Sequence, residues 1–176
     1  MISRDITIER LATASDLLLA PFELNEASLG KILALIAEHQ VDDADLYFQY
    51  TRSEGWSLEE GIVKTGSFSI DQGVGVRAVA GERTAFAYSD DISLASLTDA
   101  AQTVRAIGSG SRGGKVKLPS RRVAGARALY LADDPIGSLD STAKVALLEK
   151  VEQLASAKDP RVVQVMAGLA SEYDVV

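Results

Sequence analysis

Residues 73–88 read Gly-Val-Gly-Val-Arg-Ala-Val-Ala-Gly-Glu-Arg-Thr-Ala-Phe-Ala-Tyr. On both sides of the Gly81-Glu82 pair the side chains alternate in character with a period of two residues. That period is typical of half-buried strands, because successive side chains of a strand point to opposite faces. A short glycine-containing link between two such runs favours a tight turn. The stretch therefore predicts an antiparallel hairpin in which residues 73–80 pair with residues 83–88.

The residues before this hairpin also alternate. Residues 46–51 have the pattern of a half-buried strand, and the Glu54-Gly55 pair that follows is a turn signal. We therefore expect residues 56–60 and 62–70 to form two further strands of a meander. Strands that follow one another through short turns form an antiparallel sheet.

Helical periodicity appears on both sides of the strand-rich region. Residues 26–40 and 94–107 carry apolar side chains at helical spacing, and Asn25 and Ser93 precede them as candidate N-caps. Gly108 stands where a glycine often ends a helix. The first twenty-odd residues predict only one or two short helical turns.

The carboxy-terminal part predicts one more helix and one more strand. Residues 141–157 follow a candidate cap at Asp140 or Ser141, and residues 161–176 alternate like a strand. Four apolar side chains of this helix are expected to face inward, namely Val145, Leu148, Val151 and Leu154. The predicted class is α+β, a mainly antiparallel sheet flanked by two or three helices.

Composition narrows the classes of protein. The 176 residues are 47% hydrophobic and 24% charged, which is ordinary for a single globular domain. No stretch reaches the ~18 apolar residues that span a membrane, and the charged start does not resemble a signal peptide. We therefore expect a cytoplasmic protein without a membrane partner. The net charge of −7 argues against nucleic-acid binding.

One segment opposes the acidic average. Residues 100–132 contain basic side chains and no Asp or Glu. One interpretation is a solvated surface loop. The alternatives are a patch that attracts an acidic peptide or partner, or a contact with the remainder of a longer protein. The basic residues are Arg105, Arg112, Lys115, Lys117, Arg121, Arg122 and Arg127.

The residue types for catalysis are largely missing. The chain has no cysteine and one histidine, His39, whereas a zinc site needs three or four ligands. Residues 108–113 match G-x-G-x-x-G, but a predicted helix precedes them, whereas a dinucleotide site needs a strand there. The residues therefore predict no catalytic and no metal-binding residue in this chain.

The best binding candidates lie on the strand that opens the hairpin. Gly73 and Gly75 alternate along it and leave one face bare of side chains. This pattern indicates either close packing within the fold or a face that another backbone or a peptide approaches. The candidate substrate or interface residues are Gln72, Gly73, Gly75, Arg77 and Arg83.

Four segments carry a resemblance to a known family. They are residues 44–49 (ADLYFQ), 56–64 (WSLEEGIVK), 69–78 (SIDQGVGVRA) and 81–88 (GERTAFAY). In this order and spacing they resemble the amino-terminal domain of TldD-type subunits in the TldD/PmbA family. Weaker similarity continues through Asp134-Pro135, the helix near Val145 and Arg161-Val162.

The resemblance implies a function that the residues alone do not. Members of this family, which carries the older label modulator of DNA gyrase, are zinc-dependent peptidases that act on peptides and unfolded segments. A TldD-type subunit works with a PmbA (TldE) subunit, so the implied partners are such a subunit or a second copy. The family's H-E-x-x-x-H zinc motif lies in a carboxy-terminal domain and has no counterpart here, so zinc is expected only in the full-length protein.

Residues 1–176 are therefore predicted to form one amino-terminal domain of a longer protein, inactive alone, that helps to enclose substrate and to assemble the dimer. The final run of residues, which still alternates at Val176, agrees with that expectation. A free-standing binding or regulatory module that pairs with a full-length subunit is the alternative. The natural substrate and the oligomeric state are not predicted.

Overall fold

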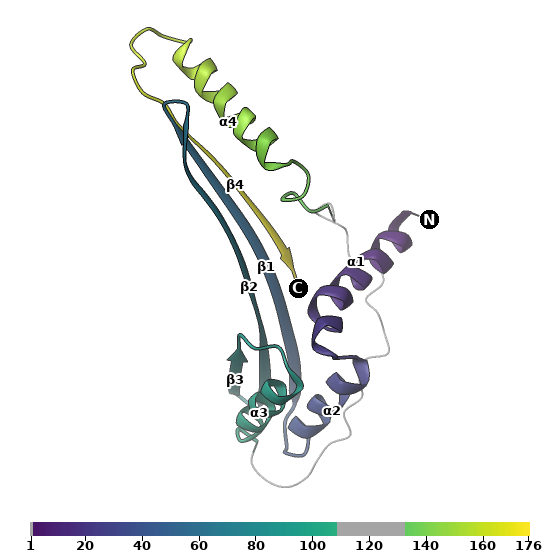
Figure 1. Ribbon diagram of the computed structural model, residues 1–176. Helices are drawn as coiled ribbons and strands as arrows, with labels where there is room; N and C mark the ends of the chain where they lie inside the picture. The colour runs from purple at the N-terminus through teal and green to yellow at the C-terminus, as the bar shows by residue number, and fades with distance from the viewer. Residues whose placement is uncertain (1, 109–132) are drawn as a thin grey trace. The chain divides into compact units, whose positions relative to one another are not determined.

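The computed structural model describes residues 2–108 and 133–176 (Figure 1). The glycine-rich motif beyond Gly108 and most of the predicted basic segment lie outside the described residues. Among the described residues the elements follow one another as α1 (Ile2–Leu18), the short 3₁₀ helix η1 (Ala20–Phe22), α2 (Glu26–Ile36), β1 (Asp43–Glu59), β2 (Ile62–Ala80), β3 (Arg83–Ser89), α3 (Leu94–Arg105), α4 (Ser141–Ser156) and β4 (Met166–Val175).

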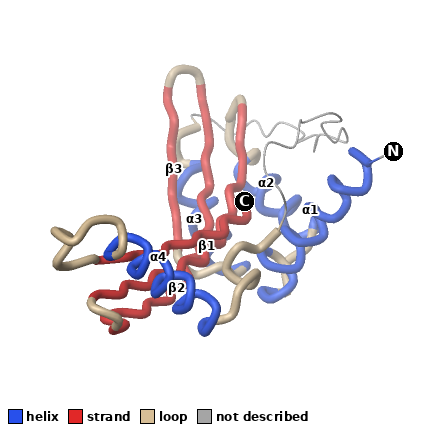
Figure 2. The backbone as a smooth tube through the Cα atoms, turned by 90° about the horizontal axis from the view of Figure 1, so that it is seen from above, coloured by secondary structure: helices blue, strands red, loops and turns tan. Residues whose placement is uncertain are grey.

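The strands, drawn in red in Figure 2, form one open antiparallel sheet. Their order in the sheet is β3-β2-β1-β4. The predicted α+β class is confirmed. The described residues fall into two compact units. The first comprises residues 2–50, 72–108 and 175–176, and the second comprises residues 51–71 and 133–174.

The predicted hairpin is present as β2 and β3. Its register runs from Val74 opposite Ser89 to Ala80 opposite Arg83. At the turn Gly81 has a φ of 61°, a left-handed conformation that costs a glycine little because it has no Cβ. The alternation on either side of this turn therefore predicted the hairpin correctly.

The predicted turn at Glu54-Gly55 is wrong. β1 continues through it to Glu59, and the chain turns at Glu60 and Gly61 instead, with φ values of 53° and 71°. Two-residue hairpins favour positive φ at both central residues, because that twist matches the strands. Gly55 has no such conformation. A Cβ built on it would lie 2.9 Å from Ser67 Oγ, so this glycine permits close packing across the hairpin.

β2 is likewise continuous from Ile62 to Ala80, where two separate strands were predicted. Hydroxyl pairs join β1 to β2 along the ribbon, Ser57 to Thr65 at 2.6 Å and Ser53 to Ser69 at 2.7 Å. From the first pair to the second, both strands advance by four residues, so the register does not slip between the two pairs.

Helices α2 and α3 pack together and α3 packs on β3, which builds the core of the first unit (Figure 1). Both predicted caps are confirmed: Asn25 accepts a hydrogen bond from the Ser28 backbone N–H at 3.0 Å, and Ser93 accepts one from that of Ser96 at 3.1 Å. Gly108 does not end α3 with a left-handed turn. Its Cα packs on the chain near Gln40, whose carbonyl oxygen would lie 2.9 Å from a Cβ. The core side chains include Ile36, Val74, Val76, Ala78, Leu97, Ala101 and Val104.

Helix α1 corrects the expectation for the first twenty residues. It runs for 17 residues instead of one or two turns. Its sequence mixes β-branched and polar residues with apolar ones and has no single apolar stripe, so the periodic signal of an amphipathic helix is weak. Leu18 at its end is buried, as is Leu24 after it. Tertiary packing therefore stabilises a helix that the local sequence pattern does not predict.

In the second unit α4 packs on the sheet through Leu148, which joins Leu58 and Ala167 in a small core. Asp140 caps the helix by accepting from the Ala143 N–H at 2.7 Å. The expectation that Val151 and Leu154 face inward is wrong, because both side chains are exposed. Each step of three residues rotates the side chain by about 300°. A row with this spacing therefore drifts round the helix, so that Leu154 lies opposite Val145.

The carboxy-terminal strand is shorter than predicted. It begins at Met166, and residues 161–165 are not part of it. β4 forms one edge of the sheet. Within the described ranges no helix is long and apolar enough to cross a membrane.

Candidate binding face and apolar pocket

Three of the predicted site residues share one face of β2. Gly73, Gly75 and Arg77 alternate with Val74 and Val76, which are buried. Because strand side chains alternate, the three lie on the face that points away from this core. The structure therefore brings them together as a row on the face of the sheet opposite this core.

The other two predicted site residues do not join this row. Gln72 has the opposite parity on β2, so it points to the other face of the sheet. Arg83 stands opposite Ala80 across the hairpin and shares that other face with it. The predicted binding role of all five residues stays a prediction.

Close packing explains why both glycines lack a side chain. A Cβ on Gly75 would lie 2.8 Å from the ring of Phe86, and one on Gly73 would lie 2.8 Å from the carbonyl oxygen of Ser89. A Cβ atom essentially never lies this close to another heavy atom, so larger residues would displace β3. Phe86 therefore covers the bare position at Gly75.

Arg77 is held by two carboxylates of β1. Its Nε donates to Asp45 Oδ2 at 2.6 Å, and its Nη2 lies 3.5 Å from Asp43 Oδ2. The hydrogen bond to Asp45, with the negative charge of both acids, raises the pKa of Arg77 further above its ordinary value. The guanidinium is thus fixed over β1 with its charge balanced, and the acids lie on the same face.

Sequence reasoning missed the aromatic side chains as part of the site. Phe86 and Tyr88 of β3 stack with centroids 6.2 Å apart and planes inclined by 25°. They are 60% and 82% exposed. Their shared face was visible in the alternation, but only packing decides which face the helices cover. The row of Asp43, Asp45, Gly73, Gly75, Arg77, Phe86 and Tyr88 is called the aromatic–acidic face below.

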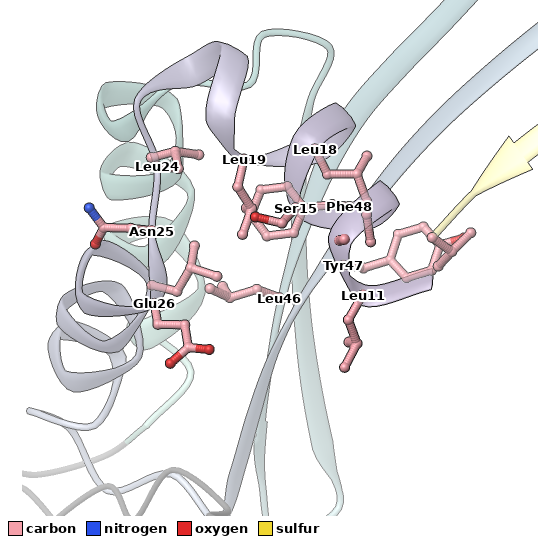
Figure 3. Close-up of a pocket in the computed structure, with 14 residues that line it drawn as sticks. Leu11, Ser15, Leu18, Leu19, Leu24, Asn25, Glu26, Leu46, Tyr47 and Phe48 are labelled. Carbon is pink, nitrogen blue, oxygen red and sulfur yellow. The ribbon is translucent and has the colours of Figure 1, made fainter. Parts of the chain in front are cut away.

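A pocket of about 790 Å³ lies in the first unit between α1, the start of α2 and β1 (Figure 3). This volume is in the range of small-molecule sites. The lining is mostly apolar, and the amide oxygen of Asn25 is already used as a helix cap. Because α1 was not predicted as a full helix, the sequence did not indicate this pocket. Apolar side chains around it include Leu11, Leu18, Leu19, Leu24, Leu46 and Phe48.

Buried charges in the second unit hold α4 to the sheet. Lys144 is 4% exposed. Its Nζ donates to Glu54 Oε2 at 2.9 Å and to the Ile136 carbonyl at 2.7 Å, and lies 2.7 Å from Glu54 Oε1. The Trp56 indole also donates to Glu54. The Lys144 hydrogen bond is the main cause that lowers the pKa of Glu54. Every strong donor and acceptor of this pair is used internally, so the pair is structural.

The donor set does not fit a metal. Among the residues whose positions are described, no three His, Cys, Asp or Glu side chains gather as a metal site. The single histidine, His39, has its Nδ1 3.5 Å from the carbonyl oxygen of Gly108. Zinc sites use three or four such ligands.

Comparison with known proteins finds a family that resembles part of this chain. Residues 44–108 match the family model described as PmbA/TldA metallopeptidase domain 1. Over these residues the chain is similar to the first domain of the PmbA/TldD metallopeptidases. The matched range contains the complete β2–β3 hairpin and α3, and so all five predicted site residues.

Curated relatives extend the match over most of the chain. The Metalloprotease TldD homolog of Haemophilus influenzae is 43% identical over 166 residues, which is 94% of this chain and 34% of that protein. The homolog from Buchnera aphidicola of Schizaphis graminum is 36% identical over the same proportions. This chain spans about a third of the length of the curated relatives it matches.

Solved structures share the fold at low sequence identity. A modulator of DNA gyrase from Bacteroides thetaiotaomicron superposes with a TM-score of 0.58 at 14% identity, covering 85% of this chain and 35% of that one. TldE from Thermococcus kodakarensis gives a TM-score of 0.51 at 16% identity, covering 84% and 34%. The fold is therefore shared with these structures at low sequence identity.

Proposed function

We propose that this chain is the amino-terminal domain of a TldD-like zinc-dependent peptidase subunit, and that it helps to enclose peptide substrate and to assemble the dimer. The observation that carries the proposal is the 43% identity with a TldD homolog over 94% of the chain. One histidine and no cysteine agree with zinc ligands that lie outside these residues. Catalysis is then a property of the whole subunit.

Assembly is the second part of the proposal. The partner is a PmbA/TldE-like subunit or a second copy of the same chain, and the shared fold with a TldE structure supports related subunits of similar build. We propose a cytoplasmic location, with which the absence of cysteine agrees.

Zinc content and peptide cleavage test the proposal. Both are measured on the 176-residue chain alone and on the same domain within a full-length subunit, each with and without a PmbA-type partner. Stoichiometric zinc and cleavage only in the full-length form support the proposal. Tightly bound zinc, or cleavage by the short chain, would contradict it. Cleavage by a separate full-length subunit that rises on adding the short chain would favour a regulatory module instead.

The role of the aromatic–acidic face in substrate enclosure has its own test. Arg77→Ala and Arg83→Ala are introduced singly into the full-length subunit, with Lys64→Ala on β2 as a control for the loss of one exposed positive charge. We expect Arg77→Ala to change KM more than the control does, because it releases Asp43 and Asp45 from their fixed positions. Unchanged cleavage by the Arg77 variant would remove this face from substrate handling, and unchanged cleavage by the Arg83 variant would remove Arg83, which lies on the other face of the sheet.

A further inference from the structure

The rings of Phe86 and Tyr88 are exposed in a way that packing within the first unit does not explain. A strand side chain that serves the core is covered, whereas these two are 60% and 82% exposed and stack on each other. Exposed aromatic rings attract cations, because the centres of their faces are negative.

The surroundings of these rings are acidic. Residues 42–50 and 72–91, which contain the aromatic–acidic face, carry six carboxylates and two guanidiniums. One of the guanidiniums, Arg77, is already held by Asp43 and Asp45. The side chain of Asp43 remains 66% exposed and that of Asp45 44%. The aromatic–acidic face therefore keeps a net negative charge beside the exposed rings.

Negative charge and open aromatic rings select the same kind of partner. A guanidinium or ammonium group gains both from carboxylates nearby and from the face of a phenyl or phenol ring. An acidic peptide or a nucleic acid would be repelled by the same charges. The complementary ligand is thus a cation-bearing chain.

We propose that the aromatic–acidic face binds an extended, arginine- or lysine-bearing segment of a peptide substrate, whose cationic side chains lie over Phe86 and Tyr88 and beside Asp43 and Asp45. This inference rests on the proposed function, because it assigns a substrate chemistry to the face for which enclosure of peptide is proposed. The rings discriminate a cation from a neutral side chain, and the carboxylates add attraction that falls with salt.

The test titrates the 176-residue chain with three peptides of equal length: alternating arginine and serine, glutamine in place of arginine, and glutamate in place of arginine. Binding is followed by NMR shifts of the aromatic ring protons. We expect the arginine peptide to bind most tightly, with an affinity that falls as salt is added, and the glutamate peptide to bind least.

Variants separate ring contacts from simple charge attraction. Phe86→Leu with Tyr88→Leu keeps the apolar surface but removes both ring faces, and should weaken the arginine peptide by about tenfold. Tyr88→Phe keeps the ring and should bind like the parent. Phe68→Leu is the matched control, because Phe68 is also an exposed aromatic residue of the sheet, at 58%, but lies in the second unit.

Four outcomes would overturn the inference. Equal affinity of the leucine double variant and the parent would exclude the rings. Equal affinity for the glutamine and arginine peptides would exclude the preference for cations and leave peptide enclosure standing. Absence of binding by all three peptides would also overturn it, while the zinc and cleavage measurements would judge the proposed function separately. Binding that appears only after the basic residues between 112 and 127 are changed to glutamine would identify the chain's own segment as the occupant.

Discussion

Lys144 is a buried cation whose hydrogen bonds all point inward, to Glu54 and to the carbonyl of Ile136. A pair of this kind contributes little net stability when it is compared with a well-packed apolar pair, because both charges lose hydration. Removal of one partner alone is different, since the other charge stays in a site that water does not reach. The pair therefore determines where α4 sits on β1 more than how stable the unit is.

Lys144→Met should destabilise the chain by about 3 kcal/mol, because it leaves the Glu54 carboxylate without its cation. The double variant Glu54→Gln with Lys144→Met should recover part of that loss. Urea unfolding followed by Trp56 fluorescence measures both. A single variant as stable as the parent would show that water reaches the pair.

The pH dependence of stability follows from the lowered pKa of Glu54, which the hydrogen bond from Lys144 causes first. A carboxyl whose folded pKa lies below its unfolded value of 4.5 stabilises the fold above that value, and the contribution is lost as the pH falls through the lower folded pKa. We expect the urea concentration at the unfolding midpoint to decrease as the pH is lowered from about 5 to about 3. Glu54→Gln should make this decline shallower.

Glu54→Gln should not abolish the acid dependence, because Asp134 contributes in the same direction. Burial acts to raise the pKa of Asp134, but the ion pair with Arg52 and the N–H groups of Ile136 and Gly137 lower it on balance. A parent chain equally stable across this range would contradict both shifts.

At the scale of elements, two tight turns determine where β1, β2 and β3 are joined. Glu60 and Gly61 join β1 to β2, and Gly81 opens the link from β2 to β3, all with positive φ. Glu152 of α4 adds a second restraint, because both its carboxylate oxygens accept from the Gly61 N–H at 2.9 Å. The positions of these turns, and not strand propensity along the chain, set the lengths of the strands.

Gly81→Ala isolates the conformational contribution of one turn. A Cβ at this position meets no atom within 4 Å, and φ is 61°, so strain alone is changed. We expect a loss of about 1 kcal/mol, and a smaller loss for Gly81→Asn, since asparagine adopts this conformation more readily. Gly168→Ala is the control, because its nearest contact of 3.7 Å is ordinary and its φ is not positive. Thermal unfolding compares the three variants, and equal losses at both glycines would refute the role of φ.

At the scale of the whole molecule the sheet has an open edge. β4 pairs with β1 on one side and has no neighbour on the other among the strands of the described ranges. An edge of this kind presents backbone N–H and C=O groups that a strand from another chain can pair with.

We expect the isolated chain to self-associate as its concentration rises. Ala170→Lys places a charge on the exposed surface of β4 and should shift the chain toward monomer, as charges on natural edge strands do. Ala146→Lys on the exposed surface of α4 is the control for added charge. Analytical ultracentrifugation that shows a clean monomer at high concentration would argue against pairing through this edge.

Local signals in the sequence determined much of this protein. Alternation over residues 73–88 predicted the β2–β3 hairpin, and Asn25, Ser93 and Asp140 marked the starts of three helices, because each of these features depends on a few neighbouring residues. The segments from residue 44 to residue 88 indicated the family, and the pattern of predicted strands and helices indicated the α+β class.

Tertiary structure alone decided the rest. Gly55 resembles a turn residue locally, but pairing with Ser67 across the hairpin keeps β1 straight through it. Helix α1, the pocket beside it and the Lys144–Glu54 pair all depend on contacts between residues far apart in the chain. The same holds for the aromatic–acidic face: alternation places Phe86 and Tyr88 together, but only the packing of α2 and α3 on the opposite side leaves them exposed. A period of two residues identifies two faces of a strand, and the burial of one of them is a property of the assembled fold.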